Sequence, residues 1–403
     1  MWSFFYYSKN FVLTLSRFYA YLRNASSLVS EYDGSTPLGI FLKKYFAGQK
    51  KYGSNDRKVV SSLCYQYYRI RHLFSNLEIE DRLLLSEFIC RNIPSKLLET
   101  LKPDWVPFMS LSIGGKLEKL GFQWSPQLHT PWHTLLQKEI SPDDYASSMF
   151  HQPNLHVRVR PAKKEKVLGI LAANHLPGEW LNENTLAFPN ATKLDDVFSI
   201  NKDVVVQDAG SQRCGDIIKK VLPHIRGKVW DACAASGGKS IQLIDLFGKI
   251  DDLLVSDIRE TILHNLSERF RQAGIHTYQS FVADLTKPLQ GKHANLKVDV
   301  ALVDVPCTGS GTWSRTPEHH YFFNPENLAT FSTRQLQICH TVIPHIKKGG
   351  HLIYITCSVF DKENKMVVEK VLQQQQLSLI HAEVIDGTQH LHDSMYVAIM
   401  QKN

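Results

Sequence analysis

Two cysteines stand just after apolar runs in the second half of this 403-residue chain. Cys307 follows the run that begins at Val298, and Cys357 follows the run that begins at Gly349. Both runs are short and rich in β-branched residues, and turn formers follow them, which predicts buried strands. Ligands bind at the carboxyl edge of open α/β sheets, so we expect both thiols to face one pocket there. Since a thiolate with a lowered pKa is a strong nucleophile, the pair indicates covalent chemistry on an electrophilic substrate.

The elements that would position such a substrate begin with a glycine-bearing turn. Asp231-Ala-Cys-Ala-Ala-Ser-Gly-Gly-Lys-Ser240 lies between a predicted strand at 228–230 and a predicted helix at 241–247. A strand, a glycine turn and a helix start hold an anionic group against backbone amides. Two interpretations remain open here, a nucleoside cofactor and a phosphate-binding P-loop. The P-loop of a nucleotide hydrolase requires a glycine where Cys233 stands, although Gly238-Lys239-Ser240 fits it.

Acidic residues end the predicted strands that follow. Asp257 closes the second run and precedes a predicted helix at 260–273, which Gly274 caps. A carboxylate at this strand end is where a cofactor ribose is held. Asp284 ends the third run and suits an adenine amino group, and Asp304 ends the fourth. One such acid is more often a helix cap, but several at successive strand ends indicate a nucleoside cofactor.

The first part of the chain, to about residue 120, shows helical periodicity. A helix near 37–46 and a second one, with Ser54 as its expected cap, form a predicted hairpin. A contact with the phosphate backbone of RNA is the functional interpretation, and a solvated helical face is the alternative. The basic residues of this hairpin are Lys43, Lys44, Lys50, Lys51, Arg57, Lys58, Arg69 and Arg71.

A connector without clear periodicity covers about 121–141, and an α+β stretch then ends near Asn201. Its predicted strand at 155–161 carries Arg158 and Arg160. Such a basic strand either contacts nucleic acid or is an edge strand that its charges protect from further pairing.

The composition is that of a globular chain of two or three domains, with 43% hydrophobic and 21% charged residues. No uninterrupted apolar run reaches the roughly 20 residues of a membrane helix. The net charge of +7 is compatible with a polyanionic partner. Seven cysteines without a C-x-x-C pair argue against a disulfide framework or a zinc site. We therefore expect a reducing, cytoplasmic location, no membrane contact and no metal.

Three blocks of the second half resemble the signature blocks of a known family. They are Asp231-Ala-Cys-Ala-Ala-Ser-Gly-Gly-Lys239, Asp304-Val-Pro-Cys-Thr-Gly-Ser-Gly311 and Tyr354-Ile-Thr-Cys-Ser358. In this order they are similar to the Sun/RsmB family of RNA cytosine carbon-5 methyltransferases, which use S-adenosyl-L-methionine. The segment 206–212 is similar to the family segment before the cofactor turn, and the basic hairpin resembles the NusB-like RNA-binding domain of bacterial members.

The resemblance implies three parts: a helical NusB-like RNA-binding domain at 1–125, a small α+β domain at 145–203, and a Rossmann-like α/β methyltransferase domain at 204–403. It implies methylation of cytosine carbon 5 in RNA, with ribosomal RNA as the expected substrate. The cofactor-binding residues that it implies are Cys233, Ala234, Ala235, Ser236, Gly237, Gly238, Lys239, Asp257, Asp284 and Asp304.

The resemblance also implies roles for the two thiols. Cys357 is the nucleophile that adds to cytosine carbon 6, Cys307 assists breakdown of the adduct, and Asp304 acts at ring nitrogen 3. DNA cytosine methyltransferases attack with the Pro-Cys cysteine instead, so an exchange of roles is an open alternative. A catalytically inactive RNA-binding protein is a further one. Cys64, Cys90, Cys214 and Cys339 are expected to be buried and inert, and for Cys233 packing in the turn is expected rather than chemistry.

The chain departs from the family pattern at three places. Ser236 stands where the family usually has proline, and we expect this to loosen the cofactor turn. Lys365 replaces the last acid of the family's Glu-Asn-Glu, which puts a role for that acid in question. The residues Asp393-Ser-Met-Tyr396 only partly match the family's aromatic ending, so the shape of the last hairpin is an open point.

Overall fold

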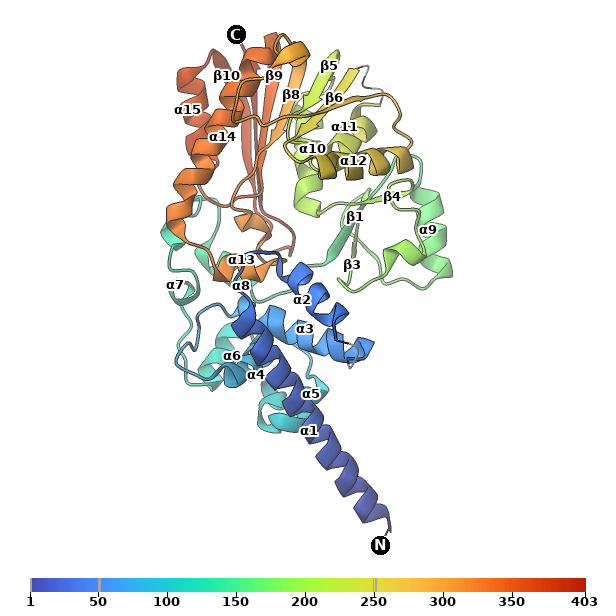
Figure 1. Ribbon diagram of the computed structural model, residues 1–403, viewed down its shortest axis with the longest axis vertical. Helices are drawn as coiled ribbons and strands as arrows, with labels where there is room; N and C mark the ends of the chain where they lie inside the picture. Colours follow the sequence, from blue (N-terminus) through green and yellow to red (C-terminus); the bar gives the residue numbers. More distant parts are fainter. Residues whose placement is uncertain (1, 50–51, 249, 251) are drawn as a thin grey trace. The chain divides into compact units, whose positions relative to one another are not determined.

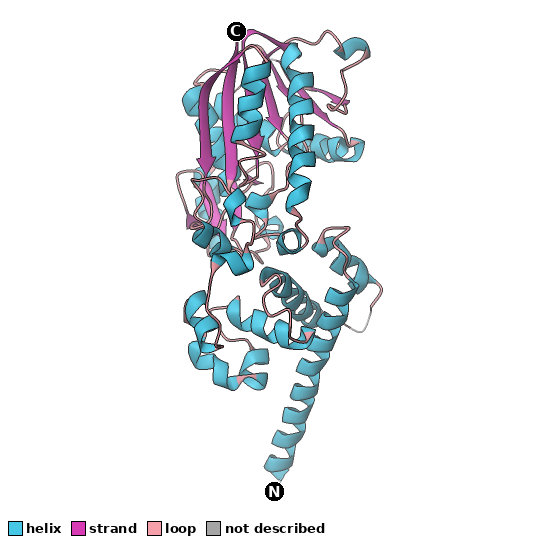
Figure 2. Cartoon of the chain, turned by 90° about the vertical axis from the view of Figure 1, so that its left-hand side faces the viewer, coloured by secondary structure: helices cyan, strands magenta, loops and turns pink. Residues whose placement is uncertain are grey.

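The computed structural model describes residues 2–49, 52–248, 250 and 252–403, with the side chains from residue 15 onward (Figure 1). The chain divides into two compact units. The first comprises the residues up to Thr134 together with Ser141–Gln152 and Trp313–Phe323. The second comprises Leu135–Ile140, Pro153–Thr312 and Asn324–Asn403. All strands assigned in the described residues lie in the second unit, whereas the first is helical (Figure 2).

The first, helical unit is organised around α3. Residues Leu63, Cys64 and Tyr68 of this helix are buried in a core to which α1 and α4 also contribute. The basic hairpin is present as α2 and α3, but the cap of α3 is Gly53 rather than Ser54, and its amide donates to Asp56. The helices of this unit are α1 (Trp2–Glu31), α2 (Leu38–Ala47), α3 (Ser54–Arg69), α4 (Ile79–Ile89), α5 (Lys96–Leu101), α6 (Ile113–Lys119), α7 (Pro126–His129), α8 (Pro142–Ser148) and α13 (Pro317–Tyr321).

Arg69 and Arg71 do not face solvent, so the predicted RNA contact is wrong for these two residues. They are only 2% and 9% exposed. The Arg69 guanidinium donates to the carbonyl oxygens of Met149, His151 and Ser314, at 3.0, 2.7 and 2.7 Å. The Nε of Arg71 donates to the backbone carbonyl of a residue in α13. These two charges therefore hold separate segments of the helical unit together.

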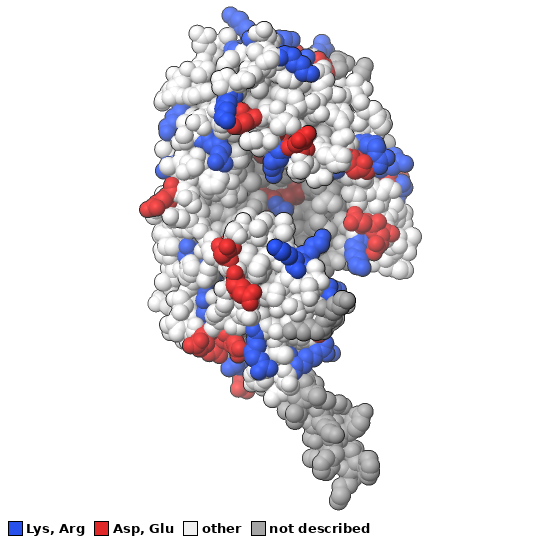
Figure 3. Space-filling view, in the orientation of Figure 1, with Lys and Arg blue, Asp and Glu red and all other residues white. Residues whose placement is uncertain are grey.

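The other described cations of the basic hairpin lie on the surface, as predicted. Lys43, Lys44, Arg57 and Lys58 are exposed, while Lys50 and Lys51 lie outside the described residues. On the face drawn in Figure 3, Lys and Arg side chains are interspersed with Asp and Glu. The excess positive charge of the chain is thus not gathered into one patch on that face. Within the described residues, no helix has the length and apolar character needed to cross a membrane.

A seven-stranded sheet forms the centre of the second unit, in the order β10-β11-β9-β8-β5-β6-β7. The strands from β9 to β7 are parallel, and β11 is antiparallel to both of its neighbours. Its strands are β5 (Lys228–Asp231), β6 (Asp252–Asp257), β7 (Gln279–Val282), β8 (Val298–Asp304), β9 (Ile346–Thr356), β10 (Leu377–Ile385) and β11 (Met395–Lys402).

Helices cover both faces of this sheet (Figure 1). Apolar residues of α10, α11 and α12 share one buried cluster with one set of strand side chains, and those of α14 and α15 share another with the alternate set. The fold is therefore a Rossmann-like α/β arrangement, as predicted. The helices are α10 (Ala209–Val221), α11 (Gly238–Phe247), α12 (Glu260–Gln272), α14 (Leu328–Val342) and α15 (Lys365–Gln374).

The α+β stretch forms a separate small sheet in the order β2-β3-β1-β4, accompanied by α9 (Lys164–Ala173). Its strands are β1 (Leu155–Val159), β2 (Glu179–Trp180), β3 (Thr185–Phe188) and β4 (Val204–Val206). Because β4 pairs with β1, the small sheet continues past residue 203. The predicted division of this half into domains at 145–203 and 204–403 stays a prediction.

Both interpretations of the basic strand β1 are wrong. The strand lies between β3 and β4, so it is not an edge. Arg158 is only 6% exposed and pairs with Asp245 of α11 at 2.6 Å, and Arg160 pairs with the same carboxylate at 2.8 Å. The two cations therefore join the small sheet to the large one and do not reach out to nucleic acid.

The helical unit contains buried histidines that predict its pH dependence. His129 is fully buried and its Nε2 bonds the carbonyl of Arg69, and burial lowers its pKa to about 4. Because an ordinary histidine has a pKa of about 6.5, the unfolded chain binds a proton between these values and the folded unit does not. The free energy of unfolding of this unit therefore has its full value above pH 6.5. It falls as the pH is lowered, by about 3 kcal/mol near pH 4. Hydrogen exchange of the α3 amides, corrected for its intrinsic pH dependence, measures this loss.

Two variants serve as controls for that experiment. His320 is 0% exposed, and no hydrogen bond to either ring nitrogen is found in the described part of the chain. His320→Phe should therefore stabilise α3 at neutral pH and flatten the decline. His276→Gln, at an exposed position, should change neither the stability of α3 at neutral pH nor its decline at lower pH. Protection of α3 that stays constant from pH 7 to pH 4.5 would contradict the assignment.

Candidate functional site

The two sequence-predicted cysteines lie side by side at the carboxyl ends of adjacent strands. In the parallel pair β8 and β9, Asp304 lies opposite Ile355, and each cysteine follows its strand within three residues. The Sγ atoms of Cys307 and Cys357 are 3.4 Å apart, and both side chains are half-buried. The hydrogen bond between the thiols and then burial raise the pKa of Cys307 well above its ordinary value. The structure thus brings the two sulfurs together.

Asp304 and Lys239 form an ion pair close to the sulfurs. The Nζ of Lys239 lies 2.5 Å from Oδ2 of Asp304. Burial alone would lower the pKa of Lys239, but the neighbouring Asp304 charge raises it above its ordinary value. The pair therefore fixes the side chain of Asp304 at the end of β8. Since this lysine bonds a carboxylate, its position does not favour the P-loop interpretation, in which lysine reaches a phosphate.

The glycine turn between β5 and α11 is held by contacts to the next strand and helix. The Ala235 amide donates to Oδ2 of Asp257 at 3.1 Å. Arg269 of α12 donates to both the carbonyl and the hydroxyl of Ser236, at 3.1 and 2.7 Å. Ser236 is therefore anchored, and the expectation that it loosens the turn is wrong. At Gly237 the φ angle is +80°, and an added Cβ would lie 2.6 Å from the Phe270 ring, so only glycine fits.

A cavity of about 530 Å³ opens beside this turn. Five predicted cofactor residues line it: Cys233, Ala235, Asp257, Asp284 and Asp304. The other five, Ala234, Ser236, Gly237, Gly238 and Lys239, belong to the turn or to the start of α11 and are not among its lining residues. The cavity reaches Pro306, the residue before Cys307, but neither sulfur lines it.

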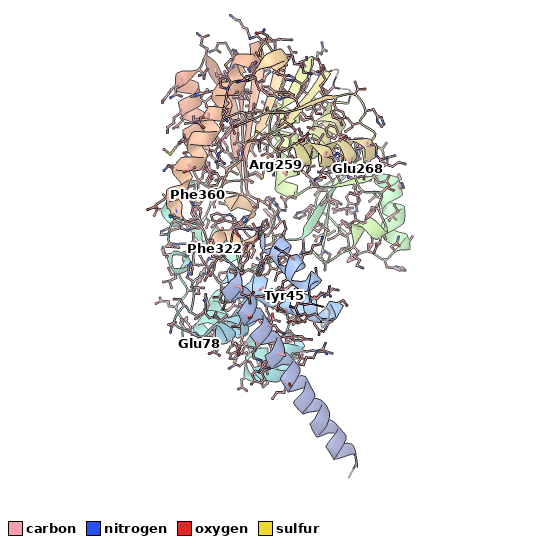
Figure 4. The ribbon with its side chains drawn as sticks, in the orientation of Figure 1. Tyr45, Glu78, Arg259, Glu268, Phe322 and Phe360 are labelled. Carbon is pink, nitrogen blue, oxygen red and sulfur yellow. The ribbon has the colours of Figure 1, made fainter. Side chains whose placement is uncertain are left out.

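The sequence prediction missed several lining residues. Arg259 follows Asp257, bonds its carboxylate at 3.1 Å and lies just before α12 (Figure 4). Ile258, 60% exposed, gives the cavity an apolar wall, and an isoleucine next to a strand-end acid was the available signal. Arg334 of α14 and Thr286 also line the cavity, and no pattern in the sequence pointed to them.

The acids around the cavity differ in their ionisation. Burial raises the pKa of Asp231, at the end of β5, to about 7, although Ser240 donates a hydrogen bond to it. The hydroxyl and the amide of Thr286 lower the pKa of Asp284. Asp284 therefore presents a carboxylate to the cavity. No group of three or more His, Cys, Asp or Glu side chains suited to a metal ion occurs among the described residues.

The comparison with protein families decides how this domain is classified. Residues 220–400 match the family model described as 16S rRNA methyltransferase RsmB/F. This part of the chain is similar to the RsmB/F methyltransferase family. The matched residues contain both cysteines, the glycine turn and all the strand-end acids. The predicted Sun/RsmB resemblance is thereby confirmed for residues 220–400.

Curated relatives agree with this assignment. The probable ribosomal RNA small subunit methyltransferase B of Synechocystis is 33% identical over 168 residues, which cover 42% of this chain and 37% of the relative. The enzyme named ribosomal RNA small subunit methyltransferase B in Proteus mirabilis is 32% identical over 174 residues, covering 43% of this chain and 40% of the relative. The chain thus matches well under two thirds of the length of these relatives.

Solved structures share the fold. The structure of PH0851 covers 95% of this chain and 98% of its own, with a TM-score of 0.66 and 18% identity. The structure of NSun6 from Pyrococcus horikoshii with SFG covers 68% of this chain and 97% of its own, with a TM-score of 0.59 and 14% identity. At these identities the likeness supports the fold of the RsmB/F domain and nothing finer.

The turn geometry predicts a difference between two glycine substitutions. Gly237→Ala and Gly274→Ala both place alanine at a positive φ, +80° and +74°. In each variant this backbone strain alone lowers the free energy of unfolding by roughly 1–2 kcal/mol. Only at Gly237 does the new Cβ collide with Phe270, whereas nothing lies within 4 Å at Gly274. Urea unfolding should therefore show Gly237→Ala to be less stable than Gly274→Ala by about 1–3 kcal/mol. Equal losses would contradict the packing described for the turn.

Proposed function

We propose that this chain transfers a methyl group from S-adenosyl-L-methionine to carbon 5 of cytosine in RNA, with ribosomal RNA as the substrate. The observation that carries the proposal is the approach of the two thiols, Cys307 and Cys357, to 3.4 Å at the strand edge beside the cavity. Covalent catalysis suits a cytosine ring because its carbon 5 is too weak a nucleophile unaided. The names of the relatives, ribosomal RNA small subunit methyltransferase B, support RNA as the substrate class.

The cavity fits the cofactor in size and chemistry. Its volume of about 530 Å³ lies in the range of small-molecule sites. Asp257 and Asp284 offer carboxylate acceptors to hydroxyl and amino groups, and Ile258 offers an apolar surface to a ring. When bound, S-adenosyl-L-methionine supplies an electrophilic methyl group. The lining residues Cys233 and Ala235 would support it from the turn.

The side chains at the strand edge divide the covalent steps between them. The Cys357 thiolate forms a bond from Sγ to carbon 6 of the ring, which makes carbon 5 electron-rich. Ring nitrogen 3 takes up the proton that the Cys357 thiol gives up, and the Asp304 carboxyl group, held in place by Lys239, forms a hydrogen bond with that nitrogen. After methyl transfer the proton on carbon 5 is removed, the bond from Sγ to carbon 6 breaks, and Cys307 assists this release.

RNA binding is assigned to the helical domain at 1–125. Its exposed hairpin cations, Lys43, Lys44, Arg57 and Lys58, suit the phosphate backbone. A target cytosine must leave its stack before a thiol reaches carbon 6, which favours a single-stranded or loop position. Bisulfite sequencing of RNA from cells with and without this protein identifies the modified position.

Substitution of each cysteine tests the assignment of roles. With RNA containing 5-fluorocytosine, Cys357→Ala should abolish both turnover and the covalent adduct. Cys307→Ala should instead leave the protein attached to its RNA, because attack proceeds while release fails. Denaturing gel electrophoresis of labelled RNA distinguishes the two. Cys90→Ala, in the helical unit, is the control and should behave as the parent protein. The opposite pattern for the first two variants would exchange their roles.

Calorimetry with Asp257→Asn tests the cofactor. The parent protein should bind S-adenosyl-L-methionine and not ATP, whereas tight ATP binding alone would establish the nucleotide hydrolase alternative. Loss of a hydrogen bond to a charged acceptor should weaken binding by about 10- to 100-fold. Asp252→Asn, at the other end of β6, affects only contacts of Asp252 with Lys228 and Gln279, which lie away from the cavity lining, and should leave binding unchanged. Absence of methyl transfer to any total RNA preparation would favour the inactive alternative.

A further inference from the structure

Glu363 places a buried carboxylate between the loops that carry the two cysteines. The residue is 0% exposed. Its Oε1 accepts from the Thr308 amide at 2.9 Å, and its Oε2 accepts from the Thr308 hydroxyl at 2.6 Å. The same Oε2 accepts from the Ser358 hydroxyl at 2.6 Å. Since Thr308 follows Cys307 and Ser358 follows Cys357, one side chain ties together the residues next to both sulfurs.

Neighbouring groups fix the position of this carboxylate. The Nε2 of Gln335, on α14, donates to Oε1 of Glu363 at 3.0 Å and to the carbonyl of Pro306 at 3.1 Å. The Tyr354 hydroxyl, on β9, donates to the backbone carbonyl of Glu363 at 2.6 Å. The loop that carries Cys307 is therefore held on both sides of the cysteine.

The loop that carries Cys357 is held in the same way by the next residue. Asn364 is also 0% exposed, and its Nδ2 donates to the carbonyl of Ser358 at 2.7 Å. The Thr356 hydroxyl donates to Oδ1 of Asn364. Thus the residues before and after Cys357 both bond the pair Glu363-Asn364. A buried carboxylate that satisfies so many donors fixes a geometry more than it adds stability.

We propose that Glu363 is a positioning residue that holds the two sulfurs at the separation needed to act in turn on one cytosine. This inference rests on the proposed function for its catalytic consequence, but the positioning itself concerns only the thiols. The Cys357 sulfur must reach carbon 6, and the Cys307 sulfur must then assist release from the same adduct. A displacement of about 1 Å between reacting groups lowers a rate by about 100-fold. The carboxylate spans the two loops and thereby prevents such a displacement.

Three substitutions separate the reach of the side chain from its charge. Glu363→Gln keeps the length: its oxygen can accept from the Thr308 amide and Gln335, and its amide can donate to the Thr308 and Ser358 hydroxyls, which also accept. Glu363→Asp keeps the charge but is one methylene short. Glu363→Ala removes the bridge. We therefore expect Gln to preserve the geometry and both Asp and Ala to lose it.

A trivalent arsenical reports on the thiol pair without any enzymatic activity. Phenylarsine oxide condenses with two thiols, forming two arsenic–sulfur bonds and releasing one water molecule. Native mass spectrometry of the full chain should show one bridged arsenical on the parent protein and on Glu363→Gln. Its apparent affinity should fall at least about 10-fold in Glu363→Asp and Glu363→Ala, because bridging depends on the effective concentration of the second thiol. Cys307→Ser defines the signal without bridging.

Turnover gives the second readout. In Glu363→Asp and Glu363→Ala, kcat should fall about 100-fold while the KM for RNA and the Kd for S-adenosyl-L-methionine stay within about threefold. Covalent protein on unsubstituted RNA should accumulate, because release needs the second sulfur. If Glu363 only stabilised the fold, its substitution would lower thermal stability but would not make the covalent adduct accumulate. Ser358→Ala, which removes one bond, should show the same trend more weakly and replaces Glu363→Ala if that variant does not fold.

The outcomes separate the two proposals. Unchanged arsenical bridging and unchanged kcat in Glu363→Ala, or loss of both in Glu363→Gln as severe as in Glu363→Ala, would overturn the positioning role. A parent protein that bridges the arsenical, loses bridging in Glu363→Ala and yet transfers no methyl group would leave the positioning role supported and reject the proposed function.

Discussion

The parallel pairing of β8 with β9 is the constraint on which the site depends. Its register sets Asp304 opposite Ile355, so the loops after the two strands leave the sheet at one level. Both strands are covered by helices on their two faces, and a shift of one residue would turn their buried side chains to the wrong face. The approach of the sulfurs to 3.4 Å thus follows from sheet register first. The buried Glu363 then refines it at the level of the loops.

Charges inside the second unit are matched where they occur. Lys239 and Asp304 neutralise each other beside the cavity, and Asp245 serves both Arg158 and Arg160 between the two sheets. An unpaired charge at these depths would cost several kcal/mol. Pairing therefore lets the fold keep charged side chains beside the cavity and between the two sheets. The three cations of these pairs are therefore not available to a polyanion.

Patterns along the chain predicted the strands, the helices after them and the residues at the strand ends. Apolar runs followed by turns locate Cys307, Cys357 and Asp257 at one sheet edge because parallel strands share that edge. Glu363 could not be assigned in this way, since its bonds to Thr308 join residues 55 positions apart. Arg69 looked like a surface cation because no periodicity reveals that residues 149–152 cover it.

The contacts of the cofactor turn could not be predicted from the sequence either, because the turn is held by a residue far along the chain and not by the proline usual in the family. Arg269 donates to Ser236 and also to the side chain of Asn201, while Arg160 donates to the backbone carbonyls of Asn201 and Ala273. These bonds connect the turn, α12 and the end of the small sheet. The small sheet and the seven-stranded sheet belong to one compact unit, and the turn is held by hydrogen bonds from Arg269 of α12.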